Sequence, residues 1–166
     1  MRNYPYAAKE MKCLRKLERK RAAVTIDHIV TVPESNETAL AQALAHTPTN
    51  VAMCCGEFID AWHLYTGGIF DEKAHCTEPI DHALLAVGYG TDPDGTQFWK
   101  IKNSWGAHWG EEGYMRVKRN IADPKGSNAV ALLPGFAVKL TDNPRPDAAI
   151  VGRKGAATPF LRAASE

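Results

Sequence analysis

The sequence predicts an α+β fold in which one helix accompanies several antiparallel strands. Three observations support this class. An alanine- and leucine-rich segment at 37–45 has the composition of a helix. Several short segments are rich in β-branched residues or alternate between apolar and polar side chains, which is the period of a strand. The turn sequence Asp92-Pro93-Asp94-Gly95 separates two of these segments, so they are expected to form a hairpin.

The first strand and the helix are expected near the beginning of the chain. Residues 22–32 are rich in β-branched side chains and precede Pro33, which is typical of a strand. Ser35 or Asn36 can cap the helix that follows, because either side chain can accept a hydrogen bond from a free backbone N–H of the first turn. Pro48 follows the helical segment and marks its end.

Beyond the helix, the pattern is one of strands and turns. Strands are expected at 51–53, 83–89, 97–102 and 114–119, with a helical turn at 62–65 and a turn at 66–68 before Ile69-Phe70. Residues 83–89 are continuously apolar, which predicts a buried strand, whereas 97–102 and 114–119 alternate. From Thr141 onward, proline, glycine and alanine increase without periodicity. We therefore expect a folded domain over 1–140 and a flexible tail at 141–166.

The overall charge excludes some classes of partner. The formal net charge is +1, so no global field attracts nucleic acid or an acidic membrane. The basic segment 9–21 is short and contains no aromatic residue, which favours a solvated face over a nucleic-acid surface. No apolar run approaches the roughly 20 residues of a membrane helix, and the N-terminus lacks the apolar core of a secretory signal. We therefore expect neither nucleic acid nor a membrane as a partner.

Histidine and cysteine residues raise the alternative of a zinc site. The candidate ligands are His63, His75, Cys76, His82, Cys54 and Cys55. Structural zinc ligands usually come in pairs separated by about two to five residues, whereas His75 and Cys76 are adjacent. The spacing is therefore poor, and the sequence predicts no metal and no cofactor.

The strongest chemical signal is a histidine and an asparagine at the two ends of the expected hairpin. His82 directly precedes the strand at 83–89, and Asn103 directly follows the strand at 97–102, so the hairpin can bring the two side chains together. If the oxygen of the Asn103 carboxamide accepts a hydrogen bond from one ring nitrogen, the other nitrogen faces outward and can exchange a proton with a nucleophile. For His82 alone, a hydrogen-bonded core histidine is the alternative.

The segments around these two residues resemble signatures of the papain-like cysteine peptidases. NSWGAHWGEEGY is similar to the Asn region of that family, and DHALLAVGYG is similar to its His region. YPY at 4–6 and GGIF at 67–70 extend the resemblance to roughly residues 4–139. The resemblance implies the C-terminal, β-barrel-like domain of the papain-like fold. It also implies that His82 is the general base and acid and that Asn103 orients it.

The same resemblance implies roles for the surrounding residues. Trp105 would shield the bond between His82 and Asn103 from water, and Trp109 would line the leaving-group side of the cleft. The main specificity pocket would be formed by Ala52, Ile80, Ala83 and Leu133. Such a pocket implies an apolar preference at the second residue before the scissile bond. The substrates would be peptides or proteins, and the compartment would be lysosomal, vacuolar or extracellular.

The chain departs from the family in its cysteines. No CGSCW-like segment with a preceding glutamine is present, so the nucleophile and the first, helical domain are expected to be missing, together with a partner for Cys13. Cys76 lies where the family has a disulfide cysteine, but the usual partner near 127–129 is absent. Cys54 or Cys55 is an alternative nucleophile, although their segment supplies no helix N-terminus to lower a thiol pKa.

Three interpretations remain open. The chain is part of a peptidase with a Cys-His-Asn mechanism, and is inactive alone because it lacks the nucleophile. Alternatively, it is a non-catalytic pseudoenzyme or binding module on the same barrel. The third interpretation is an incomplete reading of a longer coding sequence. An isolated second domain would expose the apolar face that normally packs on the first domain, which predicts aggregation.

Overall fold

The computed structural model describes residues 11–12, 26–71 and 79–139. The chain divides into two compact units, of which Val30–Phe136 forms the first and the two flanking segments form the second. All the candidate site residues described below lie in the first unit. Several predictions concern residues outside the described ranges: YPY at 4–6, the missing disulfide partners of Cys13 and of Cys76, most of the basic segment, and the tail at 141–166.

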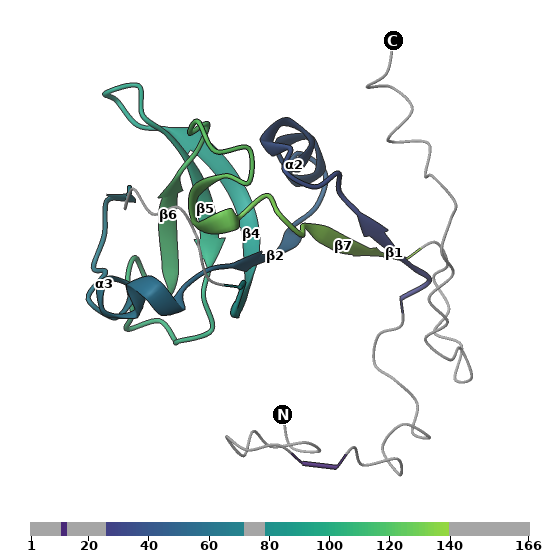
Figure 1. The fold of residues 1–166 in the computed structure, drawn as a ribbon, viewed down its shortest axis with the longest axis horizontal. Coiled ribbons are helices and arrows are strands. Elements are labelled where there is room, and N and C mark those ends of the chain that lie inside the picture. Colours follow the sequence, from purple (N-terminus) through teal and green to yellow (C-terminus); the bar gives the residue numbers. More distant parts are fainter. Residues whose placement is uncertain (1–10, 13–25, 72–78, 140–166) are drawn as a thin grey trace. The chain divides into compact units, whose positions relative to one another are not determined.

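The described part of the chain has the predicted α+β fold, built on one seven-stranded sheet (Figure 1). The strands are β1 (His28–Thr31), β2 (Thr49–Met53), β3 (Ile69–Phe70), β4 (His82–Thr91), β5 (Gln97–Lys102), β6 (Tyr114–Lys118) and β7 (Gly135–Val138). The helices are α2 (Glu37–Leu44) and α3 (Ile59–His63), with short 3-10 helices at Gly56–Phe58 and Ser127–Ala129. The strand order is β1-β7-β2-β4-β5-β6-β3. Because β1 and β3 are free edges of this order, the sheet is open, and "barrel-like" describes it only loosely.

Helix α2 begins where the capping pattern predicts. The backbone of Asn36 is extended, and its side chain accepts a hydrogen bond of 2.9 Å from the backbone N–H of Ala39. Asn36 rather than Ser35 is therefore the cap. Leu40 and Leu44 lie one turn apart and are buried, and the helix packs against β2 and β4. None of the helices in the described ranges is long and apolar enough to span a bilayer.

The hairpin β4–β5 is the element that positions the candidate site. Its turn is closed by a hydrogen bond of 2.9 Å from the Gly95 N–H to the Asp92 carbonyl, and Gly95 adopts a φ of 88°, which glycine tolerates. The pairing places Leu85 opposite Lys102 and shifts by one residue between Ala86 and Gly88. This shift is a bulge, which bends the strand without breaking the hairpin.

Two details of the predicted strands are wrong. Residues 83–89 are not continuously buried: Leu84 and Ala86 are buried, whereas Ala83 is exposed, because only one face of this antiparallel strand meets the core. The strands are not all antiparallel either, since β3 pairs with β6 in parallel through Ile69 and Phe70. Strand β7, which pairs antiparallel with β2, was not predicted.

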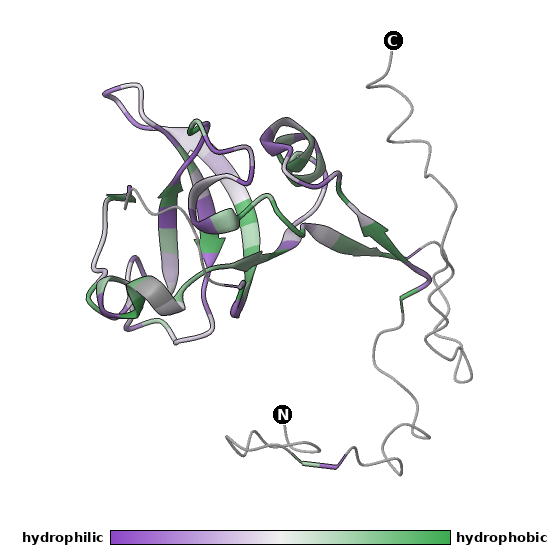
Figure 2. Ribbon diagram, viewed as in Figure 1, coloured by the Kyte–Doolittle hydropathy of each residue, from purple (hydrophilic) through white to green (hydrophobic). Residues whose placement is uncertain are grey.

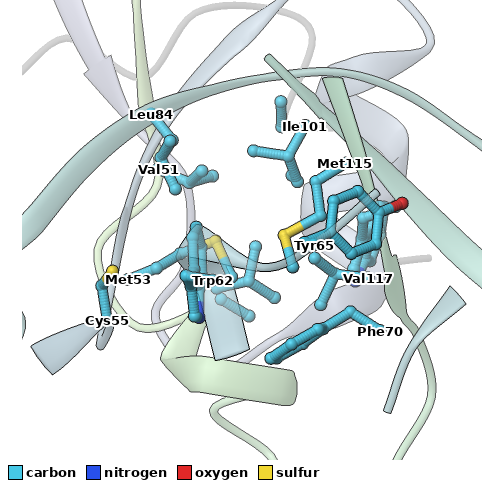
Figure 3. Packing of buried hydrophobic residues seen from close by; sticks show 14 of the residues in the cluster. Val51, Met53, Cys55, Trp62, Tyr65, Phe70, Leu84, Ile101, Met115 and Val117 are labelled. Atoms are coloured by element: carbon cyan, nitrogen blue, oxygen red, sulfur yellow. The ribbon is translucent and has the colours of Figure 1, made fainter. Parts of the chain in front are cut away.

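The hydrophobic core is built from side chains of the strands and of helices α2 and α3, and Figure 3 shows part of it. Trp62 of α3 is fully buried and meets the edge of Phe70 with ring centroids 5.9 Å apart. Met53, Ile101, Met115 and Val117 are also fully buried and come from three strands, β2, β5 and β6. The interior is therefore held by side chains from segments that lie far apart in the sequence.

Candidate active site

His82 and Asn103 meet at the open end of the hairpin. His82 is the first residue of β4, and Asn103 directly follows β5. The Nε2 atom of His82 lies 2.9 Å from the Oδ1 atom of Asn103. The structure therefore brings together the two side chains that the hairpin pattern predicts to be neighbours. Asn103 is 6% exposed, so water competes little for this hydrogen bond.

The surroundings of Asn103 determine which nitrogen of His82 carries the proton. The backbone N–H of Ser104 donates a hydrogen bond of 2.7 Å to the same Oδ1 atom, which identifies this atom as the acceptor oxygen. Nε2 of His82 must therefore donate its proton to Oδ1. The described residues give Nδ1 no hydrogen-bond partner, so this nitrogen is left to exchange a proton.

Aromatic rings hold the imidazole of His82 from two sides. The ring of Trp105 lies against it with centroids 5.5 Å apart and an interplanar angle of 36°. Trp62 presents its ring at 6.0 Å and 88°, in an edge contact. Trp62 also meets Trp105 at 6.4 Å, so the three rings form one cluster. The predicted shielding role of Trp105 remains a prediction, and this packing is compatible with it.

Trp62 is a site residue that the sequence analysis missed. It lies in the segment expected to be only a helical turn, and nothing in its local pattern indicates a contact with His82. The one available signal was its position in WHLY, shortly before the GGIF element. Trp109 packs behind Trp62: it is 9% exposed and donates its indole N–H to the Trp62 carbonyl at 2.8 Å. The place of Trp109 on the leaving-group side remains a prediction.

Asp81 fixes the beginning of β4 and was also missed as a site residue. Its two carboxylate oxygens accept hydrogen bonds of 2.8 Å from the backbone N–H groups of Cys55 and Gly56. A Cβ atom on Gly56 would lie 2.5 Å from one of these oxygens, so only glycine allows this close approach. Because Asp81 precedes His82, these bonds restrict where the imidazole can lie.

Two of the four predicted pocket residues are neighbours in the sheet. Ala52 of β2 is directly opposite Ala83 of β4 in the strand pairing. Ala52 and Ile80 are half-buried, Ala83 is exposed, and Leu133 is 52% exposed. Apolar side chains that remain accessible are compatible with a pocket for an apolar group, but their role in specificity remains a prediction.

Neither cysteine of the adjacent pair has the properties of a nucleophile. Cys54 is disulfide-bonded, and its partner is not among the described residues. Cys55 is free and 3% exposed. Burial, together with the nearby Asp81 carboxylate, raises the pKa of the Cys55 thiol to about 11. An activated cysteine requires the opposite shift.

Cys55 is therefore expected to react slowly with iodoacetamide at mildly alkaline pH. A rise of the thiol pKa from 9.0 to about 11 lowers the thiolate fraction about 100-fold. Alkylation followed by peptide mapping is expected to show labelling of Cys55 at least about 100-fold slower in the folded chain than in the same chain in urea. Fast labelling of Cys55 that is lost in His82→Ala would instead identify it as a nucleophile.

The residues that the structure describes contain no group of three or more histidine, cysteine, aspartate or glutamate side chains that could hold a metal ion. His63 lies next to Trp105, with ring centroids 4.8 Å apart, and His82 is bound to Asn103. His75 and Cys76 lie outside the described ranges.

The fold and the site together define a class of protein: an α+β domain in which a buried carboxamide orients an imidazole, as in peptidases that use a cysteine nucleophile. The chain belongs to the papain family of cysteine proteases, whose family model matches residues 1–133. It is 40% identical over 147 residues to "Cysteine protease 1" of Oryza sativa subsp. japonica, covering 87% of this chain and 29% of the relative. It is 42% identical over 143 residues to "Probable cysteine protease RD21B" of Arabidopsis thaliana, covering 86% of this chain and 29% of the relative.

Solved structures confirm the predicted papain-like fold. Bromelain from Ananas comosus, in complex with the E64 inhibitor, superposes with a TM-score of 0.71 at 30% identity, covering 81% of this chain and 60% of that chain. The Carica candamarcensis cysteine protease CMS1MS2 gives a TM-score of 0.70 at 36% identity, covering 83% and 60%. The chain thus spans less than a third of the length of the two curated relatives and 60% of each of these structures.

Proposed function

We propose that this chain supplies the His–Asn half of a Cys-His-Asn peptidase site, and that the nucleophilic cysteine comes from polypeptide outside these 166 residues. The observation that carries the proposal is the hydrogen bond of 2.9 Å from His82 Nε2 to Asn103 Oδ1, which leaves Nδ1 for the reaction. In this proposal residues 1–140 are the second domain of the peptidase, and a helical first domain completes it. A lysosomal, vacuolar or extracellular compartment belongs to the same proposal.

The chemistry follows from the free Nδ1 atom. Nδ1 takes the proton of the cysteine thiol, which gives a thiolate and an imidazolium. The thiolate attacks the scissile carbonyl carbon, and the imidazolium returns its proton to the departing amine, which leaves an acyl-enzyme. Water then attacks the acyl carbon while Nδ1 accepts its proton, and the thiolate leaves. Throughout, Asn103 is neutral and accepts the Nε2 proton, so it orients the ring without adding charge.

The surrounding residues have supporting parts in this proposal. Trp105 covers the imidazole and limits access of water to the hydrogen bond between His82 and Asn103. Trp109 contributes to the leaving-group side of the cleft. The pocket residues are Ala52, Ile80, Ala83 and Leu133. They favour an apolar residue at the second position before the scissile bond, because burying an apolar side chain there removes it from water.

The isolated 166-residue chain is expected to show no hydrolysis of a dipeptidyl-aminomethylcoumarin substrate, because it has no activated thiol to deprotonate. A fusion that places the helical first domain of the rice relative before Met1 is expected to hydrolyse it, with a preference for apolar over basic residues at the second position before the cleaved bond. Replacing the cysteine of the CGSCW-like segment in the fusion with alanine is the control and abolishes turnover. Hydrolysis by the isolated chain that disappears in His82→Ala would contradict the proposal.

A further inference from the structure

A sequence pattern for N-linked glycosylation lies at the start of helix α2. Asn36-Glu37-Thr38 is the one place in the 166 residues where an asparagine is followed two positions later by serine or threonine, without an intervening proline. The transferase that attaches such sugars modifies the asparagine and requires the hydroxyl two positions on. Asn36 and Thr38 are both exposed, and Figure 2 colours the segment that leads into α2 as hydrophilic. A sugar attached here can project into solvent.

Glu37, the middle residue of the pattern, points inward and fixes how the pattern is presented. Its Oε1 atom accepts a hydrogen bond of 2.9 Å from the indole N–H of Trp99, which is fully buried. Its Oε2 atom accepts another, also of 2.9 Å, from the backbone N–H of Asn120. Successive side chains of a helix lie about 100° apart around its axis. With Glu37 held against Trp99, its two neighbours are turned away from the interior, in agreement with their exposure.

The two polar atoms of the Asn36 carboxamide have different tasks. Oδ1 accepts the hydrogen bond of 2.9 Å from the Ala39 N–H and so caps the helix. Nδ2 donates no hydrogen bond to any residue that the structure describes. N-linked sugars are attached at Nδ2, and the attachment leaves the amide oxygen unchanged. The helix cap and a sugar can therefore exist on the same side chain.

The glycosylation pattern lies far from the candidate active site. Glu37 is bonded to Trp99 of β5, and Trp99 is directly opposite Tyr89 of β4 in the strand pairing. Tyr89 lies near one end of β4 and His82 is at the other, so about 20 Å of strand separates them. A sugar on Asn36 is therefore attached at the other end of β4 from the imidazole of His82.

We propose that Asn36 is the acceptor of an N-linked oligosaccharide when the chain enters the secretory pathway. The donor is an oligosaccharide joined to a lipid diphosphate. A bond forms between Nδ2 and C1 of the first sugar, and the bond from C1 to the diphosphate oxygen breaks. Nδ2 gives up one of its two hydrogens as a proton, and the lipid diphosphate leaves. The proposal extends the compartment part of the proposed function and does not depend on the peptidase chemistry.

Translation of the 166-residue chain behind an added signal sequence, with microsomes present, tests the acceptor. The unchanged chain is expected to give one product of lower mobility on a denaturing gel, which endoglycosidase H returns to the mobility of the unmodified chain. Thr38→Val removes the required hydroxyl but keeps Asn36, and it is expected to lose the shift completely. Thr38→Ser keeps a hydroxyl and is the matched control, with the shift retained.

The signal sequence is supplied in this experiment, so neither an inactive peptidase fusion nor a different natural compartment changes its result. No shift in the unchanged chain, or a shift that persists in Thr38→Val, would overturn the proposal.

Urea denaturation of the same chain secreted from yeast tests whether the sugar and the helix cap coexist. Asn36→Asp cannot be glycosylated but keeps an oxygen that caps the helix, so it is expected to unfold at the same urea concentration as the glycosylated chain. Asn36→Ala loses both the sugar and the cap, and it is expected to unfold at a lower concentration. A glycosylated chain that unfolds as early as Asn36→Ala would contradict the separate tasks given to Oδ1 and Nδ2.

Discussion

Replacement of His82 by alanine in the fusion with the helical first domain is expected to lower kcat/KM by about 10⁴-fold or more. The nitrogen Nδ1 is the only group assigned to take the thiol proton and return it to the leaving amine. Without the imidazole, the thiol remains protonated at neutral pH and the amine leaves without a proton. Steady-state kinetics on a dipeptidyl-aminomethylcoumarin substrate measure this loss.

His28→Ala is the matched control for that experiment. His28 is an exposed histidine of β1 and has no part in the site, so its replacement is expected to change kcat/KM by less than about threefold. The kcat/KM of Asn103→Ala is expected to lie between those of His82→Ala and His28→Ala, with a loss of about 100-fold. The His82 ring then loses its orientation but keeps both nitrogens. Equal activity of His82→Ala and His28→Ala would show that His82 is a core histidine with no part in catalysis.

Replacement of Trp62 by alanine is expected to lower the free energy of unfolding by about 3–5 kcal/mol. Trp62 is fully buried and contacts Phe70, Trp105 and Trp109 as well as the imidazole of His82. Removing its ring leaves a cavity at the centre of this cluster, which the surrounding rings cannot fill without moving. Urea denaturation followed by far-UV circular dichroism measures the change.

Two control variants separate loss of volume from loss of chemistry. In Trp62→Phe an aromatic ring remains, and the lost indole N–H has no hydrogen-bond partner among the described residues, so the expected cost is only about 1 kcal/mol. Leu64→Ala removes a side chain that is 78% exposed and is expected to change stability by less than about 0.5 kcal/mol. A cost below about 1.5 kcal/mol for Trp62→Ala would contradict the role given to this ring.

The parts of the fold that local patterns encode were predicted from the sequence. The cap of α2 depends on Asn36 and the residues that directly follow it, and the hairpin β4–β5 depends on alternation around one turn. The closeness of His82 and Asn103 follows from that hairpin, because the two residues flank its open end. These features need no knowledge of distant contacts.

The features that were missed depend on segments far apart in the chain. The parallel pairing of β3 with β6 joins residues separated by the whole β4–β5 hairpin, and periodicity within β3 cannot indicate it. The contact of Trp62 with His82 and the bonds of Asp81 to the Cys55 and Gly56 backbone are also long-range. Only the packed structure shows that these residues support the imidazole.

The most direct test of the account is ¹⁵N NMR of the His82 ring in the isolated chain, at about pH 8 where imidazoles are mostly neutral. The account predicts a protonated Nε2 and an unprotonated Nδ1, held in that tautomer by Asn103 Oδ1 at 2.9 Å, and loss of the preference in Asn103→Ala. A proton on Nδ1, or the averaged signals of a solvated histidine in the unchanged chain, would contradict it.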